Sequence, residues 1–284
     1  MQTKGVGTLR FKKIYIEISN ICNLRCSFCP GTKRDPRRMT TDEFIGILNK
    51  CKGYTEFLYF HLLGEPLCHP ELAEFLKIAE EKQFKVIITT NGTLLKNQGD
   101  LLLRSPAVHK IVISLHSFEA NDRKTPFSEY LDACFSFAKQ AESNKIVALR
   151  LWNNGGEDAL NSEILKHLEG YFNKPWKDSR GGTAVGDKVF LQFGDKFDWP
   201  NTDAEATDQP LFCYGLRDQL GILCDGTVVP CCLDSEGTIN LGNIFKSDLE
   251  SIITSKRATD LFNGFSNRTP TEELCRKCGY AKRF

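Results

Sequence analysis

The sequence lacks the features that would place it in a membrane or on a highly charged partner. No run of apolar residues reaches the roughly 18 residues that a membrane-crossing helix needs, so we expect no membrane span. The 37 basic residues almost balance the 36 acidic residues, which leaves a formal net charge of +1. A chain with so little net charge has no overall field that would draw it to nucleic acid or to an anionic membrane.

A secretory signal is also missing, because the first ten residues contain no long apolar segment. Twelve cysteines in a chain without such a signal indicate metal binding in a reducing compartment rather than disulfides. We therefore expect a cytoplasmic protein in which the cysteines hold metal cofactors. Twelve residues precede the first expected strand, so we expect no separate peptide-recognition domain there.

Apolar runs with strand character alternate with stretches of helical periodicity over residues 13–195. The expected strands are 13–18, 56–61, 85–90, 109–115, 146–152 and 188–193. Such alternation is typical of βαβ units with a parallel sheet. Six units fit this length, whereas a closed eight-fold barrel usually needs ~250 residues. The sequence therefore predicts an α/β fold with a partial six-stranded barrel over 1–194, a linker over 195–212, and a small C-terminal domain with a β-hairpin and a helix over 213–284.

Three cysteines, Cys22, Cys26 and Cys29, stand close together directly after the first expected strand. Their C-x3-C-x2-C spacing lets a short loop present three thiolates to three irons of a [4Fe–4S] cluster. Such clusters normally have four cysteine ligands, so the fourth iron would be open to a further ligand. The alternative is a zinc site completed by one of three other residues, Cys51, Cys68 or His69.

Polar and glycine-containing segments follow the ends of the later expected strands. Gly64-Glu65-Pro66 follows the second strand, Thr90-Asn91-Gly92 follows the third, and Ser114 and His116 stand at the end of the fourth. In parallel barrels the functional residues gather at the carboxyl ends of the strands. We therefore expect these segments to form one site together with the cysteine loop.

A second group of cysteines lies in the C-terminal part of the chain. Asp225-Gly226 between two apolar runs predicts a hairpin, and a stretch with helical character follows near Asp248–Phe262. The hairpin and a final C-x2-C pair supply four cysteines, Cys213, Cys231, Cys275 and Cys278. Four cysteines suit either a second [4Fe–4S] cluster or a structural zinc ion.

The other cysteines and the basic residues are less informative. Cys51, Cys68, Cys134 and Cys224 are expected to pack in the core, where free cysteine is common. The basic run over residues 33–38 predicts either a solvated loop or an anion-binding loop.

Taken together, the cysteine triplet and the Gly-Glu-Pro segment resemble the signature of the radical S-adenosylmethionine (SAM) enzymes. The resemblance implies a partial (β/α)6 barrel whose open iron binds SAM. One departure is Leu63, which stands where the family has the first glycine of Gly-Gly-Glu-Pro. The SAM-binding residues implied are Phe28, Gly64, Glu65, Pro66, Thr90, Ser114, His116 and Arg150. A packing role is the alternative for His116 and Arg150.

The C-terminal part resembles the auxiliary-cluster domains of the SPASM and Twitch type. Four well-placed cysteines, fewer than in a full SPASM domain, fit the shorter form with one extra [4Fe–4S] cluster. The resemblance implies that a reducing flavodoxin or ferredoxin drives cleavage of SAM to a 5′-deoxyadenosyl radical. That radical would abstract hydrogen from a peptide or a small molecule, in a two-electron oxidation or another modification.

Three roles are open to Cys232, which directly follows Cys231. Its thiol could give a hydrogen atom to a substrate radical, which would make the enzyme an epimerase. It could also replace Cys231 as a cluster ligand, or merely pack. Two alternatives outside radical catalysis are a non-catalytic iron–sulfur electron carrier and a zinc-stabilised binding module.

Overall fold

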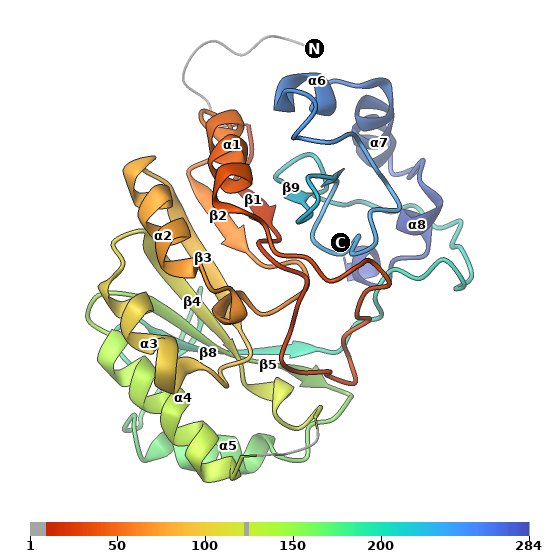
Figure 1. Cartoon of the computed structure of the whole chain (residues 1–284). Helices are drawn as coiled ribbons and strands as arrows, with labels where there is room; N and C mark the ends of the chain where they lie inside the picture. Colours follow the sequence, from red (N-terminus) through yellow and green to blue (C-terminus); the bar gives the residue numbers. More distant parts are fainter. Residues whose placement is uncertain (1–9, 122–124, 284) are drawn as a thin grey trace.

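A single mixed sheet of ten strands runs through the protein. The computed structural model describes residues 10–121 and 125–283. Of the first ten residues, where the sequence predicted no secretory signal, only Arg10 is among them. The strand order is β10-β9-β1-β2-β3-β4-β5-β8-β7-β6. Helices cover the outer face of the sheet, and the C-terminal elements lie beside its β1 side (Figure 1). Within these residues no helix has the length and apolar character needed to cross a membrane.

Six neighbouring parallel strands form the barrel wall, as expected from the sequence. They are β1 (Lys13–Ile16), β2 (Phe57–Phe60), β3 (Lys85–Thr90), β4 (Val108–Ser114), β5 (Ile146–Asn154) and β8 (Val189–Asp195). The carboxyl ends of parallel strands meet at one edge of the sheet. The segments that follow these strands therefore come together there.

Five helices connect the six strands. They are α1 (Thr41–Cys51), α2 (Leu72–Glu81), α3 (Leu95–Arg104), α4 (Phe127–Ala141) and α5 (Asn161–Glu169). The first begins at a capping box in which the Glu43 amide donates to Thr40 Oγ1 and the Thr40 amide donates to the Glu43 carboxylate. The apolar faces of the helices pack on the sheet; Phe44, for example, stacks on Phe75 with ring centroids 4.3 Å apart. In the described chain no helix directly follows β8, and residues 196–218 contain neither helix nor strand.

A short hairpin that the sequence did not predict precedes β8. Its strands are β6 (Lys177–Ser179) and β7 (Gly182–Ala184), and β7 pairs antiparallel with β8. Each strand has three residues, and none of their side chains is buried. Segments this short and exposed carry no apolar alternation, which is the signal that periodicity analysis needs.

The C-terminal part continues the barrel sheet. The predicted hairpin is present as β9 (Gln219–Ile222) and β10 (Val228–Val229), and β9 pairs in parallel with β1. The single helix expected next is in fact two, α6 (Leu249–Ile253) and α7 (Lys256–Ser266). The next helix, α8 (Glu273–Arg276), contains Cys275, and Cys278 follows it. Three 3-10 turns complete the described elements, η1 (Pro66–Cys68), η2 (Leu115–Ser117) and η3 (Tyr280–Arg283).

The basic loop after the cysteine triplet joins the barrel to the C-terminal part. Arg34 donates two hydrogen bonds to the buried Glu17 carboxylate, at 2.6 and 2.8 Å, and a third to the Ser235 carbonyl at 2.9 Å. Glu17 also accepts from the Cys224 amide at 3.0 Å. Arg37, from the same loop, pairs with Glu43. The two arginines are therefore paired within the protein, a role that neither of the two expectations, a solvated loop or an anion-binding loop, had included.

Replacing Arg34 by alanine should lower the free energy of unfolding by about 3–5 kcal/mol, because Glu17 would keep a buried charge without a partner. The matched control is Lys12→Ala, which removes a pair of equal length, 2.6 Å to Asp218, from an exposed site. That control should cost little stability, because water and salt screen an exposed ion pair. Chemical denaturation of both variants measures the difference, and equal losses would show that Arg34 is no buried tie.

Candidate active site

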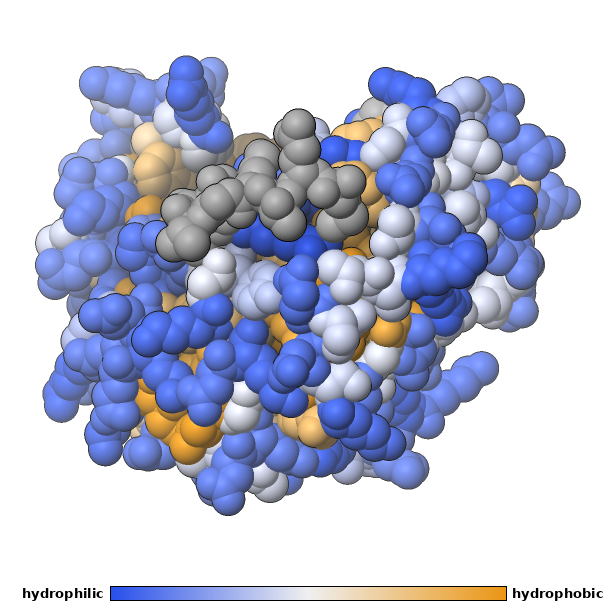
Figure 2. Space-filling model, turned by 90° about the horizontal axis from the view of Figure 1, so that it is seen from above, coloured by the Kyte–Doolittle hydropathy of each residue, from blue (hydrophilic) through white to orange (hydrophobic). Residues whose placement is uncertain are grey.

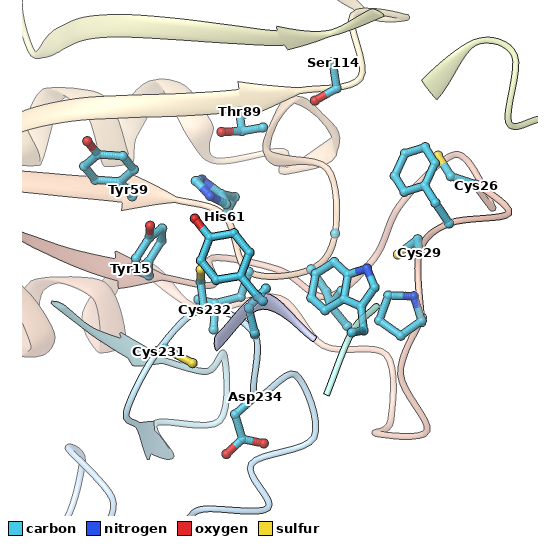
Figure 3. A pocket seen from close by; sticks show the side chains of 18 of the residues that line it. Tyr15, Cys26, Cys29, Tyr59, His61, Thr89, Ser114, Cys231, Cys232 and Asp234 are labelled. Carbon is cyan, nitrogen blue, oxygen red and sulfur yellow. The ribbon is translucent and has the colours of Figure 1, made fainter. Parts of the chain in front are cut away.

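One large cavity opens where the carboxyl ends of the barrel strands meet the C-terminal part (Figure 3). Its volume is about 1110 Å³, above the upper end of the range usual for a single small-molecule site. Both cysteine groups line it: Cys22, Cys26, Cys29, Cys213, Cys231, Cys275 and Cys278. The two metal centres predicted from the sequence therefore face one shared space.

Nitrogen donors point at the sulfurs of the triplet loop. The Leu24 amide lies 3.4 Å from Cys22 Sγ, and Asn121 Nδ2 lies 3.1 Å from Cys26 Sγ. Asn91 Nδ2 lies 3.9 Å from Cys22 Sγ. Hydrogen bonds to cluster sulfurs help to set the potential of iron–sulfur centres, so this surrounding suits thiolate ligands.

Burial opposes ionisation of the same thiols. It raises the pKa of Cys22 to about 11 and also raises the pKa values of Cys26 and Cys29. Thiolates at neutral pH would therefore need a bound metal cation, which deprotonates the thiols that coordinate it. The three residues fit a metal cluster better than they fit free reactive cysteines.

The zinc alternative for the triplet finds little support in the described residues. Cys51 is fully buried in the main core, and His69 Nε2 lies 3.1 Å from the Met39 carbonyl. Cys68, which was expected to pack in the core, is instead partly exposed. It accepts a hydrogen bond from the Asn23 amide and raises the pKa of Cys22, so it lies near the triplet. No three His, Cys, Asp or Glu side chains of the described chain are placed to hold one metal ion.

The Gly-Glu-Pro loop packs against the backbone that leads into the triplet. Gly64 has φ +77°, and a Cβ atom there would lie 2.1 Å from the Ser19 carbonyl oxygen. The Glu65 amide donates to the Ile21 carbonyl at 3.0 Å. The close approach therefore depends on Gly64, while Leu63 is buried against the cavity.

Buried Glu65 organises the strand ends around it. Its carboxylate accepts from the Leu67 amide at 3.1 Å and from the Asn91 amide at 2.8 Å, and the Thr90 hydroxyl also bonds to it. Burial raises the pKa of Glu65, and these hydrogen bonds oppose the shift. Asn91 then donates to Asn23 Oδ1 at 2.9 Å, which links β3 to the triplet loop.

Two asparagines were missed as site residues by the sequence analysis. Asn91 stood in a segment noted at a strand end, so its position was a usable signal. Asn121 accepts from the Arg25 amide at 2.8 Å and donates to the Ser117 carbonyl at 2.7 Å. It lies in a loop between η2 and α4, where no pattern in one sequence would reveal it.

On the opposite wall, Phe28 and His116 lie in ring contact with centroids 4.8 Å apart. Burial lowers the pKa of His116 to about 4, so the ring is neutral near pH 7. Arg150 stacks on Trp152, with its guanidinium carbon 3.9 Å from a ring centroid. His116 Nδ1 lies 3.1 Å from the Arg150 carbonyl, so His116 links β5 to Phe28.

Seven of the eight residues predicted to contact SAM line the cavity: Phe28, Gly64, Glu65, Thr90, Ser114, His116 and Arg150. Pro66 does not line it; this residue starts η1 and is buried. The contacts of these eight residues with SAM remain predictions.

The four tail cysteines come together from three segments. Burial, together with nearby Cys278, raises the pKa of Cys213 to about 11. Burial is also the main reason why the pKa values of Cys231 and Cys275 are well above the usual range, and each is raised further by Cys213. The described thiols are all free. Four cysteine sulfurs, one from a buried residue and three from partly buried ones, that influence one another suit a closed cluster site.

The adjacent residues Cys231 and Cys232 face different surroundings (Figure 3). Cys213, Cys232 and Cys275 all raise the pKa of Cys231. Cys232 also raises the pKa of Cys213, but its own thiol hydrogen-bonds to the Tyr15 hydroxyl. Cys232 also packs beside Tyr15 in a small apolar cluster. This placement fits the prediction that Cys231 is the ligand and Cys232 is not.

The fold and the two cysteine groups define a class of iron–sulfur enzymes that use SAM. The radical SAM superfamily model matches residues 16–149, and the SPASM iron–sulfur cluster-binding domain model matches residues 213–279. The chain belongs to the radical SAM superfamily and carries a C-terminal SPASM-type domain. Its cofactors are SAM, the [4Fe–4S] cluster that binds SAM, and auxiliary iron–sulfur.

Curated relatives match only parts of the chain. A tungsten-containing aldehyde ferredoxin oxidoreductase cofactor-modifying protein of Pyrococcus furiosus is 34% identical over 91 residues, which are 31% of this chain and 26% of that protein. A probable GTP 3′,8-cyclase of Methanocaldococcus jannaschii is 32% identical over 110 residues, 37% of this chain and 36% of that protein. The chain thus matches between about a quarter and about a third of these relatives' lengths.

Solved structures share the fold across nearly the whole chain. BtrN in complex with AdoMet and 2-DOIA superimposes with a TM-score of 0.60 at 18% identity, covering 94% of this chain and 92% of BtrN. Streptococcus suis SuiB bound to precursor peptide SuiA gives a TM-score of 0.59 at 19% identity, covering 96% of this chain and 71% of SuiB. At these identities the likeness shows the fold alone.

Gly64→Ala should abolish SAM binding, because the added Cβ collides with the Ser19 carbonyl and forces the loop off the triplet segment. Gly31→Ala is the matched control: φ is also positive, at +63°, but no atom lies within 4 Å of the added Cβ. The control should lose only ~1 kcal/mol of stability to backbone strain. Equilibrium dialysis with SAM separates the two, and tight binding by Gly64→Ala would contradict the proposed packing.

Proposed function

We propose that this SAM-dependent radical enzyme is an oxidoreductase or maturase that carries out a two-electron oxidation or modification of a peptide or a small molecule. When bound, the triplet cluster supplies an electron, received from a flavodoxin or ferredoxin, that cleaves SAM to methionine and a hydrogen-abstracting 5′-deoxyadenosyl radical. The observation that carries the proposal is that both cysteine groups line one cavity. A substrate in that cavity has SAM on one side and an electron acceptor on the other.

The chain divides the work between its two cysteine groups. The triplet is proposed to hold the SAM-binding cluster, and the tail cysteines are proposed to hold the acceptor within the 213–284 domain. Buried Glu65 and Asn91 fix the loops around SAM, and Phe28 supplies an aromatic surface for adenine. We also propose that the barrel domain spans residues 1–194, that a linker spans 195–212, and that the protein is cytoplasmic.

The substrate class has two precedents among proteins of this fold. SuiB binds a precursor peptide and BtrN binds 2-DOIA, so peptide and small-molecule substrates are both compatible with this architecture. Fold alone does not choose between them.

A radical epimerase is the second candidate, and the placement of Cys232 favours it. Its thiol lines the cavity and accepts a hydrogen bond from Tyr15, on the barrel side of the hairpin. An S–H bond is weak enough for a carbon radical to take its hydrogen. In that reaction the hydrogen removed by the deoxyadenosyl radical is replaced by one from Cys232, and no electron leaves the substrate. The thiyl radical left on Cys232 returns to a thiol by taking up one proton and one electron, the electron coming from the flavodoxin or ferredoxin.

Replacing Cys22, Cys26 and Cys29 together by alanine should abolish 5′-deoxyadenosine formation, because no thiolate remains to hold the open cluster. The wild type should contain about eight irons per chain after anaerobic reconstitution, and the triple variant about four, at four for each cluster. Metal analysis and chromatography of the reaction measure both. Retained 5′-deoxyadenosine would overturn the triplet assignment, and four irons plus one zinc in the wild type would make the tail site structural. A wild type that never forms 5′-deoxyadenosine would favour the electron carrier.

Cys232→Ser should keep the full iron content, whereas Cys231→Ser, the matched neighbour, should lose the tail cluster. If Cys232 is the hydrogen donor, wild-type product formed in deuterated water carries one deuterium at the reacting carbon, and the Cys232→Ser product carries none. Mass spectrometry reads the label. Unchanged turnover of Cys232→Ser without solvent deuterium in the wild-type product would return Cys232 to packing and leave the oxidation.

A further inference from the structure

Three cations from three strands line the inner wall of the barrel. Lys13 begins β1, Lys110 lies in β4, and Arg150 lies in β5, where it pairs in register with Ser114. Lys13 lies over the rings of Tyr15 and Tyr59, with its Nζ 5.2 and 5.3 Å from their centroids. The basic side chains are therefore directed inward from the sheet.

No carboxylate of the described residues neutralises these cations. The cavity contains two acidic side chains, and backbone amides already bind both: Leu67 and Asn91 donate to Glu65, and Thr238 and Ile239 donate to Asp234. None of the three cations takes part in an ion pair or a side-chain hydrogen bond within the described chain. Asp218 is the one carboxylate that raises the pKa of Lys13 among the causes found for it, and its own ion pair is with Lys12, at 2.6 Å.

Polar atoms on the same wall also lack partners. Arg150 Nε, His61 Nδ1 and Thr89 Oγ1 are buried without a hydrogen-bond partner in the described residues. All three residues line the cavity, and Figure 3 shows His61 and Thr89 beside Tyr15 and Tyr59. Buried polar groups without partners cost free energy, so the wall is built to meet polar atoms of something bound.

The cations also act on one another. Burial lowers the pKa values of Lys13, Lys110 and Arg150; Arg150 lowers those of both lysines further, and Lys13 lowers that of Lys110. SAM alone does not offset this charge, because its sulfonium and ammonium groups outnumber its single carboxylate. If Arg150 takes that carboxylate, the two lysines still face the cavity.

We propose that Lys13 and Lys110, with Arg150, bind a multiply charged anionic group of the substrate, either a phosphoryl group or a pair of carboxylates. The substrate is then a small anionic molecule whose charged end lies against the barrel wall. This inference rests on the proposed function for the identity of the occupant as substrate. The cation set itself is independent of the radical chemistry.

The test is calorimetric titration of the anaerobically reconstituted protein with inorganic pyrophosphate and, separately, with succinate, at constant ionic strength. We expect at least one of the two probes to bind. Tighter binding of pyrophosphate would identify the substrate's charged group as phosphoryl, and tighter binding of succinate would identify it as a pair of carboxylates. Lys110→Met should weaken that binding roughly tenfold or more, because a charge-assisted contact is lost, and Lys110→Arg should restore most of it. Lys12→Met, which removes the same charge outside the cavity, should bind as the wild type does.

Several outcomes would overturn the inference. One is that neither probe binds. Another is that the wild type and Lys110→Met bind a probe equally well. If Lys110→Met does not fold, Lys13→Met takes its place in this comparison. A shift of the tail-cluster reduction potential in Lys110→Met without a change in anion binding would instead assign the cations to cluster charge. SAM cleavage by the wild type is measured in parallel. Anion binding without 5′-deoxyadenosine would remove the proposed function and leave the anion site standing.

Discussion

The parallel ladder between β1 and β9 brings together parts of the chain that are two hundred residues apart, and the active site depends on it. Ile14 pairs with Leu220, and Tyr15 pairs with Gly221. A side chain at Gly221 would press on Val229, Leu62 and the Cys231 carbonyl, so glycine lets the hairpin close on the barrel. This pairing places Cys231 and Cys232 over the strand ends. Without it the two cysteine groups would belong to separate sites.

The buried Arg34–Glu17 pair reinforces that ladder from the side of the triplet loop. Glu17 directly follows β1 and bonds to Arg34 and to the Cys224 amide, so one carboxylate ties the triplet segment and the tail hairpin to the first strand. Buried ion pairs add little stability compared with apolar packing, but they are costly to break. Such a contact suits a junction that must keep one geometry.

Much of the fold was predictable because long periodic segments carry their own signal. Residues 85–90 were expected as a strand and form β3, and the Asp225-Gly226 turn gave the tail hairpin. The parallel pairing of β9 with β1 was not predictable, since nothing local marks which edge a hairpin will join. Gly64 was expected from the motif, but its contact with Ser19 required the folded chain. Lys13 and Lys110 gave no warning, because a lysine in a short strand reads as a solvent-facing residue.

The unpaired cations show why the interior of the barrel must be considered together with what it binds. Lys13, Lys110 and Arg150 are partly buried, and a folded protein seldom leaves charges that are partly removed from water unpaired, because a partner of opposite sign offsets the free energy that this removal costs. Lys13 and Arg150 both influence Cys232, so a charged ligand at this wall would lie beside the thiol that is proposed as the hydrogen donor of an epimerase. If both proposals hold, neighbouring side chains select the charge of the substrate and the fate of its radical, and a ligand held at the wall would fix the carbon that Cys232 can reach.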